Sequence, residues 1–160
     1  FLRLKNNIMS TKGSGFTLLE LLVVIGILGI LSAAGLLTYN GYIKSAKRNS
    51  AENITQQIAL AQTEEYANSA SYLATQTGNV NGDFTTASPC TASAASTTAI
   101  ENGLFQGDNV IPDDIDFWVC ILGNDSASDF IISAQEQAGL TLTGCRIDLK
   151  RNSTAKRTGC

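Results

Sequence analysis

The sequence predicts an α+β protein, with one long N-terminal helix packed on a small antiparallel β-sheet and a disulfide-bounded C-terminal loop. An uncharged apolar run extends from Leu21 to Leu37, and no proline or glycine interrupts the chain from Tyr42 to Tyr72. Strand-like segments follow only in the last third of the chain. A helical pattern followed by strand patterns is the element order of an α+β fold.

The apolar run is long enough for the first half of the helix to cross a membrane. Residues 16–39 supply the roughly 20 positions that a helix needs to span the hydrocarbon core. A cleaved signal peptide has a shorter apolar region of about 7–15 residues, so a retained span is favoured. Residues 1–15 carry three basic side chains and no acid, which predicts a cytoplasmic leader and an outward-facing C-terminal part: Arg3, Lys5 and Lys12. Met9 is the sole methionine and a candidate native start.

Glu20 is the one ionisable carboxyl group in the apolar segment. A charged side chain at the centre of a membrane helix costs roughly 2.5–3.5 kcal/mol, and less near an end. A carboxylate in such surroundings needs a counter-charge. The group that neutralises Glu20 therefore bears directly on function.

The junction at Gly15, followed by FTLLELLVVIGILGIL over residues 16–31, resembles the prepilin processing site of type IV pilins and pseudopilins. The resemblance implies that a membrane aspartyl peptidase cleaves after Gly15 and that the new N-terminal Phe16 is N-methylated. It also implies that Glu20 pairs with the N-terminal amine of a neighbouring subunit and sets the register of a filament. Relatives commonly have a helix-kinking proline where this chain has Leu37, so any kink is expected to be spread over nearby glycines: Gly26, Gly29, Gly35 and Gly41.

The composition beyond the leader argues against several classes of protein. Residues 16–160 carry eight Lys and Arg (11 minus 3) against 14 acids, a net charge of −6, which does not suit a general nucleic-acid-binding protein. The chain has no histidine, and the phosphate-binding pattern G-x-x-x-x-G-K-[ST] is absent. We therefore expect no enzyme and no cofactor, and a motor ATPase would be a separate protein.

Calcium is the one metal that the sequence leaves open. No EF-hand spacing is present, so a solvated acidic loop is favoured over a metal site. Some pseudopilins similar to this chain bind calcium in the corresponding region. The acids concerned are Asp108, Asp113, Asp114, Asp116, Asp125 and Asp129.

All the cysteines follow the membrane segment: Cys90, Cys120, Cys145 and Cys160. No C-x-x-C pair occurs, and an even number on the outward side indicates two disulfides in an oxidising compartment. Three connectivities are possible. Pairing between sequence neighbours would give Cys90–Cys120 and Cys145–Cys160. The resemblance implies the second bond, because pilins usually close their C-terminal segment with a disulfide.

Residues 40–75 are predicted to continue the helix as its exposed half. One narrow face carries small or apolar residues, followed by a glutamate: Ala51, Ile54, Ile58, Ala61 and Glu65. Three cations follow the membrane segment closely: Lys44, Lys47 and Arg48. They are expected either to remain in solvent around the helix or to form salt bridges with acids of adjacent subunits, and the sequence favours neither.

Residues 76–115 are predicted to be a connecting loop region, because the small polar residues from 85 to 99 show no periodicity. Residues 116–160 would form the sheet and the C-terminal segment. Strand signals lie at Asp116–Leu122, Asp129–Ala134 and Leu140–Leu149, with a turn at residues 123–126 and a phase shift that predicts a bulge at Gly144. We expect Trp118 in the core.

The segment between the last two cysteines is a basic patch on an acidic body. Its cations are candidates for contact with DNA or another anionic surface: Lys150, Arg151, Lys156 and Arg157. Contact with acidic loops of a neighbouring subunit is favoured, because oppositely charged patches on one subunit suit head-to-tail assembly.

These features and the resemblance predict a structural subunit of a type IV pilus-like filament. The subunit would leave the inner membrane for a helical homopolymer outside the cell that serves adhesion, motility or DNA uptake. Its partners would be other copies of itself, a prepilin peptidase and methylase, an inner-membrane assembly platform and the separate motor. Two alternatives remain: the major pseudopilin of a type II secretion system and a DNA-binding minor pilin. The disulfide-bounded tail favours a pilus over a pseudopilus.

Overall fold

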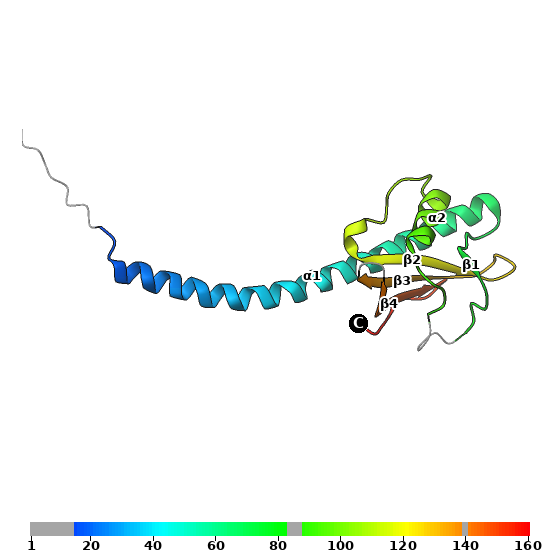
Figure 1. Cartoon of the computed structure of the whole chain (residues 1–160). Helices are drawn as coiled ribbons and strands as arrows, with labels where there is room; N and C mark the ends of the chain where they lie inside the picture. The colour runs from blue at the N-terminus through cyan, green and yellow to red at the C-terminus, as the bar shows by residue number, and fades with distance from the viewer. Residues whose placement is uncertain (1–14, 83–87, 139–140) are drawn as a thin grey trace, which may run out of the picture. The chain divides into compact units, whose positions relative to one another are not determined.

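The computed structural model describes residues 15–82, 88–138 and 141–160 of the 160-residue chain. The chain divides into two compact units, Phe1–Tyr42 and Ile43–Cys160, and the second is called the head below. In chain order the elements are α1 (Leu18–Ser69), β1 (Gln76–Thr77), α2 (Ala94–Leu104), the 3-10 helix η1 (Asp113–Ile115), β2 (Phe117–Gly123), β3 (Phe130–Ala138), β4 (Thr141–Lys150) and β5 (Lys156–Thr158) (Figure 1). The predicted α+β class is confirmed.

The helix α1 is continuous from Leu18 to Ser69, through Leu37 and the glycines around it. It ends where Ala70 adopts a positive φ of 56°, a left-handed conformation that closes many helices at their C-terminal end. The amide of Ala70 donates the last bond of the helix, to the carbonyl of Tyr66 at 2.9 Å. The helix therefore ends at Ser69, six residues before residue 75, the predicted end of its exposed half.

The five strands form one sheet in the order β1-β2-β3-β4-β5. The three central strands lie within two residues of their predicted starts, and they pair antiparallel as expected. The register shifts where Gln135–Gln137 of β3 faces Leu142–Arg146 of β4, so the irregularity falls at the predicted bulge around Gly144. The sequence did not predict the two short outer strands, β1, parallel to β2, and β5, antiparallel to β4.

The two faces of the sheet contribute to different apolar clusters. On one face, Ala51, Ile54 and Ile58 of α1 share a core with Ile132, Ala134 and other sheet residues. The predicted helix face is therefore buried at these three positions, whereas Ala61 and Glu65 are only half-buried. On the other face, the segment that carries Cys90 packs with Cys120, Leu122 and Ile131. Trp118 packs against this second cluster and is half-buried, not fully enclosed as expected.

The prediction of an uninterrupted loop region over residues 76–115 was wrong, because α2 lies within it. Ser93 caps this helix: its hydroxyl accepts the amide of Ser96 at 3.1 Å, and the hydroxyl of Ser96 accepts the amide of Ser93 at 2.9 Å. Ile100 of α2 is fully buried in the main core. The cap and one apolar anchor thus make a helix from a tract without obvious periodicity.

Side-chain hydroxyls bond the outer edge of β2 where β1 does not reach. The hydroxyl of Thr75 accepts the amide of Ile121 at 2.9 Å and donates to the carbonyl of Ile121 at 3.0 Å. The hydroxyl of Thr97 accepts the amide of Val119 at 3.0 Å. Two threonines therefore take the place of a neighbouring strand along this edge.

The side chain of Gln62 in α1 forms hydrogen bonds with the segment that follows the helix. Its amide nitrogen donates to the carbonyl of Leu73 at 2.6 Å, and its amide oxygen accepts the N–H of Leu73 at 2.9 Å. The side chain is fully buried. Sequence reasoning missed Gln62 and the buried Thr55 because both are polar residues on an otherwise apolar helix face.

Candidate functional site

The N-terminal junction begins with three non-helical residues, Gly15 to Thr17, before α1 starts at Leu18. The hydroxyl of Thr17 accepts the amide of Glu20 at 3.2 Å, and its carbonyl accepts the amide of Leu21 at 3.3 Å. Thr17 therefore caps α1, and Glu20 lies in the first turn, where the helix dipole favours a negative charge. The pattern T-x-x-E is the sequence signal for this cap, and it was overlooked.

The carboxylate of Glu20 is exposed on an apolar helix. The described residues form five ion pairs, and Glu20 takes part in none of them. Its large apolar neighbours are also exposed, from Phe16 at 80% and Leu18 at 83% to Val24 at 48%. By length and composition alone, α1 has a stretch near the N-terminus that is apolar enough to cross a membrane. The leader cations and Met9 lie outside the described residues.

The cations that follow the apolar segment form salt bridges within the chain. Lys47 pairs with Asp116 at 2.6 Å, at the start of β2, and Arg48 pairs with Glu136 of β3 at 3.1 Å. Arg48 also donates to the carbonyl of Cys160 at 3.2 Å. For these two cations, the proposed pairing with adjacent subunits is therefore replaced by pairing inside the head. Lys44 is exposed.

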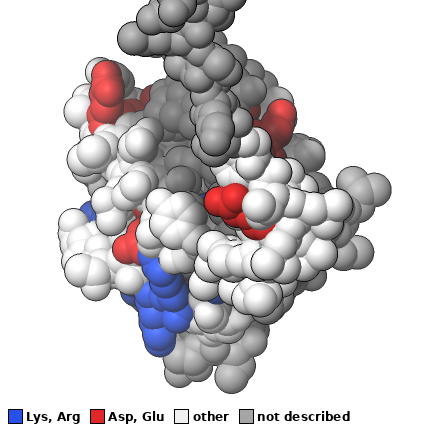
Figure 2. All heavy atoms as spheres, turned by 90° about the vertical axis from the view of Figure 1, so that its left-hand side faces the viewer, with Lys and Arg blue, Asp and Glu red and all other residues white. Residues whose placement is uncertain are grey.

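The basic C-terminal segment is largely neutralised in the same way. Arg157 pairs with Glu52 of α1 at 2.6 Å and donates to Asn49, and Arg151 pairs with Asp129 at 3.0 Å. Arg151 also lies over the ring of Tyr72 at 5.7 Å, as a cation–π contact. On the face shown in Figure 2, Lys and Arg side chains gather in one small area, with acids at several separate places. Of the four cations predicted as a DNA contact, Arg151 and Arg157 are therefore already paired with acids of the same head.

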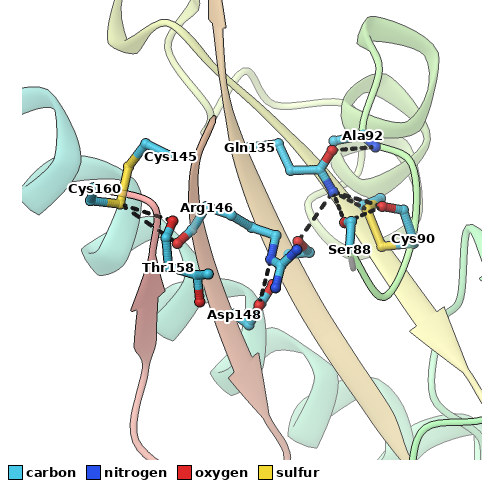
Figure 3. A network of polar contacts seen from close by, with 11 residues as sticks. Ser88, Cys90, Ala92, Gln135, Cys145, Arg146, Asp148, Thr158 and Cys160 are labelled. Atoms are coloured by element: carbon cyan, nitrogen blue, oxygen red, sulfur yellow. Dashed lines mark hydrogen bonds and ion pairs between the residues drawn. A yellow bond between two sulfur atoms is a disulfide. The ribbon is translucent and has the colours of Figure 1, made fainter. Parts of the chain in front are cut away.

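Both disulfides are present, Cys90–Cys120 and Cys145–Cys160, which is the pairing of sequence neighbours. They lie at opposite sides of a polar network that crosses β3 and β4 (Figure 3). Buried Gln135 of β3 donates to the carbonyl of Cys90 at 2.6 Å and to the hydroxyl of Ser88, and accepts the amide of Ala92 at 3.3 Å. A single glutamine therefore holds the loop around the first disulfide against the sheet.

The network continues to a carboxylate on β4. Ser133 donates to Asp148 at 2.7 Å, and Arg146 donates to the other carboxylate oxygen at 2.7 Å. Burial raises the pKa of Asp148 above its ordinary value of 3.8, although the bonds from Ser133 and Arg146 act in the opposite direction. These groups are bonded to one another, so they form a polar network between β3 and β4.

The acids considered for calcium lie in several segments: Asp113 and Asp114 are exposed in η1, just before Asp116 in sequence. Asp116 pairs with Lys47 and Asp129 with Arg151, whereas Asp108 and Asp125 are exposed in separate loops. Among the described residues, no group of three or more potential metal-ligating side chains is close enough to hold a metal ion.

The geometry at the N-terminus defines a class of protein: an apolar helix with one first-turn carboxylate, preceded by a glycine and followed by a separate head. A family model for the prokaryotic N-terminal methylation motif matches residues 11–36. The resemblance of the junction is thus confirmed: the chain carries the prokaryotic N-terminal methylation motif at these residues and is similar to type IV pilins over part of its length.

The relatives that match are similar to this chain over 35 to 60 residues. The chain is 57% identical over 35 residues to prepilin peptidase-dependent protein D of Escherichia coli, covering 22% of this chain and 24% of that protein. It is 42% identical over 60 residues to type IV major pilin protein PilE1 of Neisseria gonorrhoeae (38% and 36%) and to a fimbrial protein of Neisseria meningitidis (38% and 35%). The match thus spans about a quarter to a third of these relatives. No solved structure matches the chain significantly.

Proposed function

We propose that this protein is a structural subunit of a type IV pilus-like filament. The observation that carries the proposal is Glu20, an exposed carboxylate on an apolar helix within the methylation motif, which takes part in none of the ion pairs of the described residues. Its relatives include a type IV major pilin and a fimbrial protein. Before assembly the helix anchors the subunit in the inner membrane, with the head outside.

Processing in this proposal follows from the junction. A prepilin peptidase cleaves between Gly15 and Phe16, and Phe16 is then N-methylated. The relative from Escherichia coli is named as dependent on such a peptidase. Gly15 precedes the helix, has no side chain and meets no heavy atom within 4 Å at its Cβ position, so the bond after it lies in a non-helical, exposed part of the chain.

The role of Glu20 is to set the register between subunits. An α-amine released by cleavage carries a positive charge, and pairing it with a carboxylate of another chain removes two isolated charges from an apolar environment. Truncation of one partner in such a pair costs roughly 3–5 kcal/mol, because the other charge is left uncompensated. In its apolar segment each subunit has one amine, at Phe16, and one carboxylate, at Glu20, so the same contact can repeat from subunit to subunit along a polymer.

We place the filament among pili rather than secretion pseudopili. The support is the disulfide that closes the C-terminal segment and the pilin names of the relatives. The DNA-binding alternative has less support, because Arg151 and Arg157 already pair with acids of the same head.

The experiment is expression of the full chain in a cell that has a prepilin peptidase, followed by mass spectrometry and electron microscopy of sheared filaments. We expect a mature N-terminus at N-methylated Phe16 and fibres that contain this chain. Glu20→Gln should still be cleaved and inserted but should yield few or no fibres. The matched control is Glu64→Gln, an exposed carboxylate on the same helix, which should leave fibres unchanged.

Two outcomes would overturn the proposal. An intact leader on membrane-inserted protein in the presence of an active peptidase would exclude processing. Normal fibre yield from Glu20→Gln would show that Glu20 does not set the register.

A further inference from the structure

A small, partly open cavity lies in the head between α2, the segment of residues 111–113 and the start of β2. It has a volume of about 70 Å³. Its walls are Trp118 and Phe117 of β2, one face of α2, and side chains from the connecting segment. The polar groups that reach it are Thr98, Glu101, Asp113 and Gln137.

Several of these polar groups are not used by the fold. Thr97, also in the wall, is bonded to β2, and one oxygen of Glu101 accepts the amide of Ile111 at 3.0 Å. In contrast, the hydroxyl of Thr98, the amide of Gln137 and the indole N–H of Trp118 have no hydrogen-bond partner within the described part of the chain. Trp118 and Gln137 are half-buried, whereas Thr98 is exposed. Polar groups without a protein partner beside a cavity are available to a ligand.

The lining selects a small cation. Two acidic residues, half-buried Glu101 and exposed Asp113, line the cavity together with Phe117 and Trp118, and no basic side chain is among the described residues that line it. An ammonium group bonds to carboxylate, hydroxyl and amide oxygens and is attracted to an indole ring. A cavity of about 70 Å³ has room for the end of an alkylammonium chain, whereas a whole sugar ring is too large to fit inside it.

The same head has few cations left to fill such a site. Residues 16–160 contain eight Lys and Arg, and five of them form ion pairs inside the chain. The remaining three are Lys44, Lys150 and Lys156. Lys150 donates to Asn81 at 3.1 Å, and Lys156 is exposed on β5, opposite Asp148, whose carboxylate is already bonded to Ser133 and Arg146.

Lys156 cannot reach the cavity of its own head. It lies on the last strand of the sheet, and the cavity lies beside β2, three strand spacings or roughly 14 Å away. A donor at one edge of a sheet and an acceptor beside the other is a heterologous arrangement, and such a contact joins copies head to tail.

We propose that this cavity binds a primary ammonium group, supplied by Lys156 of a neighbouring copy. The assignment of the neighbour depends on the proposed filament, whereas the ammonium site itself can be tested without one. Protonated lysine enters between Glu101 and Asp113 with its alkyl stem along Trp118, and the contact adds a link between the globular heads of neighbouring subunits.

The ammonium site is tested on the full chain solubilised in detergent. Trp118 is the only tryptophan, so its fluorescence reports on the cavity wall directly. N-acetyl-lysine methylamide should change the emission saturably, and the neutral analogue N-acetyl-norleucine methylamide should not. Glu101→Gln keeps an acceptor for Ile111 but removes the charge, and it should weaken binding about tenfold. Glu64→Gln is the control and should bind normally. Equal responses to both amides, or unchanged binding in Glu101→Gln, would overturn the site.

The source of the lysine is tested in assembled material. Filaments made from mixed ¹⁵N-labelled and unlabelled chains are treated with a carbodiimide, and intermolecular amide links are identified by mass spectrometry. Links from Lys156 to Glu101 or Asp113 support the proposal. Filaments in which those acids are linked to other lysines or to none would overturn Lys156 as the source. Failure to form filaments would count against the proposed function and leave the fluorescence result intact.

Discussion

Replacing Gln62 by methionine should destabilise the head strongly, because the two bonds that this buried side chain makes to Leu73 have no substitute. Methionine has nearly the same length, so the substitution removes hydrogen bonds with little change in volume. The N–H and the carbonyl of Leu73 are then left without their partner. Each unsatisfied buried group costs about 1–3 kcal/mol, so the expected loss is about 2–6 kcal/mol in the free energy of unfolding.

The assay is urea or thermal unfolding of the full chain in detergent, monitored through the fluorescence of Trp118, which lies in the head. A head of 118 residues (160 minus 42) should lose about 4 °C in Tm for each kcal/mol, so the shift is expected to be about 8–24 °C. The matched control is Gln56→Met, an exposed position on the same helix, where a change below about 0.5 kcal/mol is expected. A loss below about 1 kcal/mol in Gln62→Met would refute the reasoning, since it would show that residues 70–75 do not depend on this clamp.

Three further predictions concern the disulfides, the buried acid and the helix cap. Replacing Cys145 and Cys160 by alanine should lower the free energy of unfolding by about 3 kcal/mol, because their disulfide closes a loop of 15 residues. Replacing Cys90 and Cys120 should lower it by about 3.6 kcal/mol, because that loop has 30 residues. Urea midpoints in the reverse order would contradict this loop-entropy account. The pKa of Asp148 is raised in the folded state, so folding favours its protonated form: its contribution to stability should be greatest below its unfolded pKa and fall as the pH rises through the folded value. In unfolding curves from pH 3 to pH 7, Asp148→Asn should lack this part of the pH dependence, and an unchanged profile would exclude the carboxyl as its origin. Ser93→Ala should cost about 1 kcal/mol and speed hydrogen exchange in the first turn of α2, and unchanged exchange there would show that the cap is dispensable.

The sequence predicts well those elements whose signal is local. The apolar run and the glycine-free stretch predict α1 to within six residues of its end, and β-branched and aromatic residues predict β2 and β3. The strands β1 and β5 have two and three residues, and their backbone bonds depend on β2 and β4 rather than on their own side chains. Local propensity therefore carries no information about them.

The same distinction applies to the site. The processing junction is a contiguous motif, so it can be recognised without a structure, as can the T-x-x-E cap once it is sought. The pairing of cations in the head depends on residues far apart in sequence. Lys47 and Asp116 are 69 positions apart, and Glu52 and Arg157 are 105 apart. The sequence showed a basic tail, and only the folded chain shows that its arginines are already neutralised.

The threonines along the outer edge of β2 have a consequence for subunits that are crowded together. An open strand edge invites pairing with the sheet of another molecule, and such pairing leads to irreversible aggregation. Here the hydroxyls of Thr75 and Thr97 occupy the backbone groups of Ile121 and Val119, and the opposite edge is a strand of three residues that includes Lys156 and Arg157. Neither edge offers a long, bare template. Heads of the proposed polymer can therefore be stored side by side at high density and still join only through side-chain contacts, which form and separate without rebuilding a sheet.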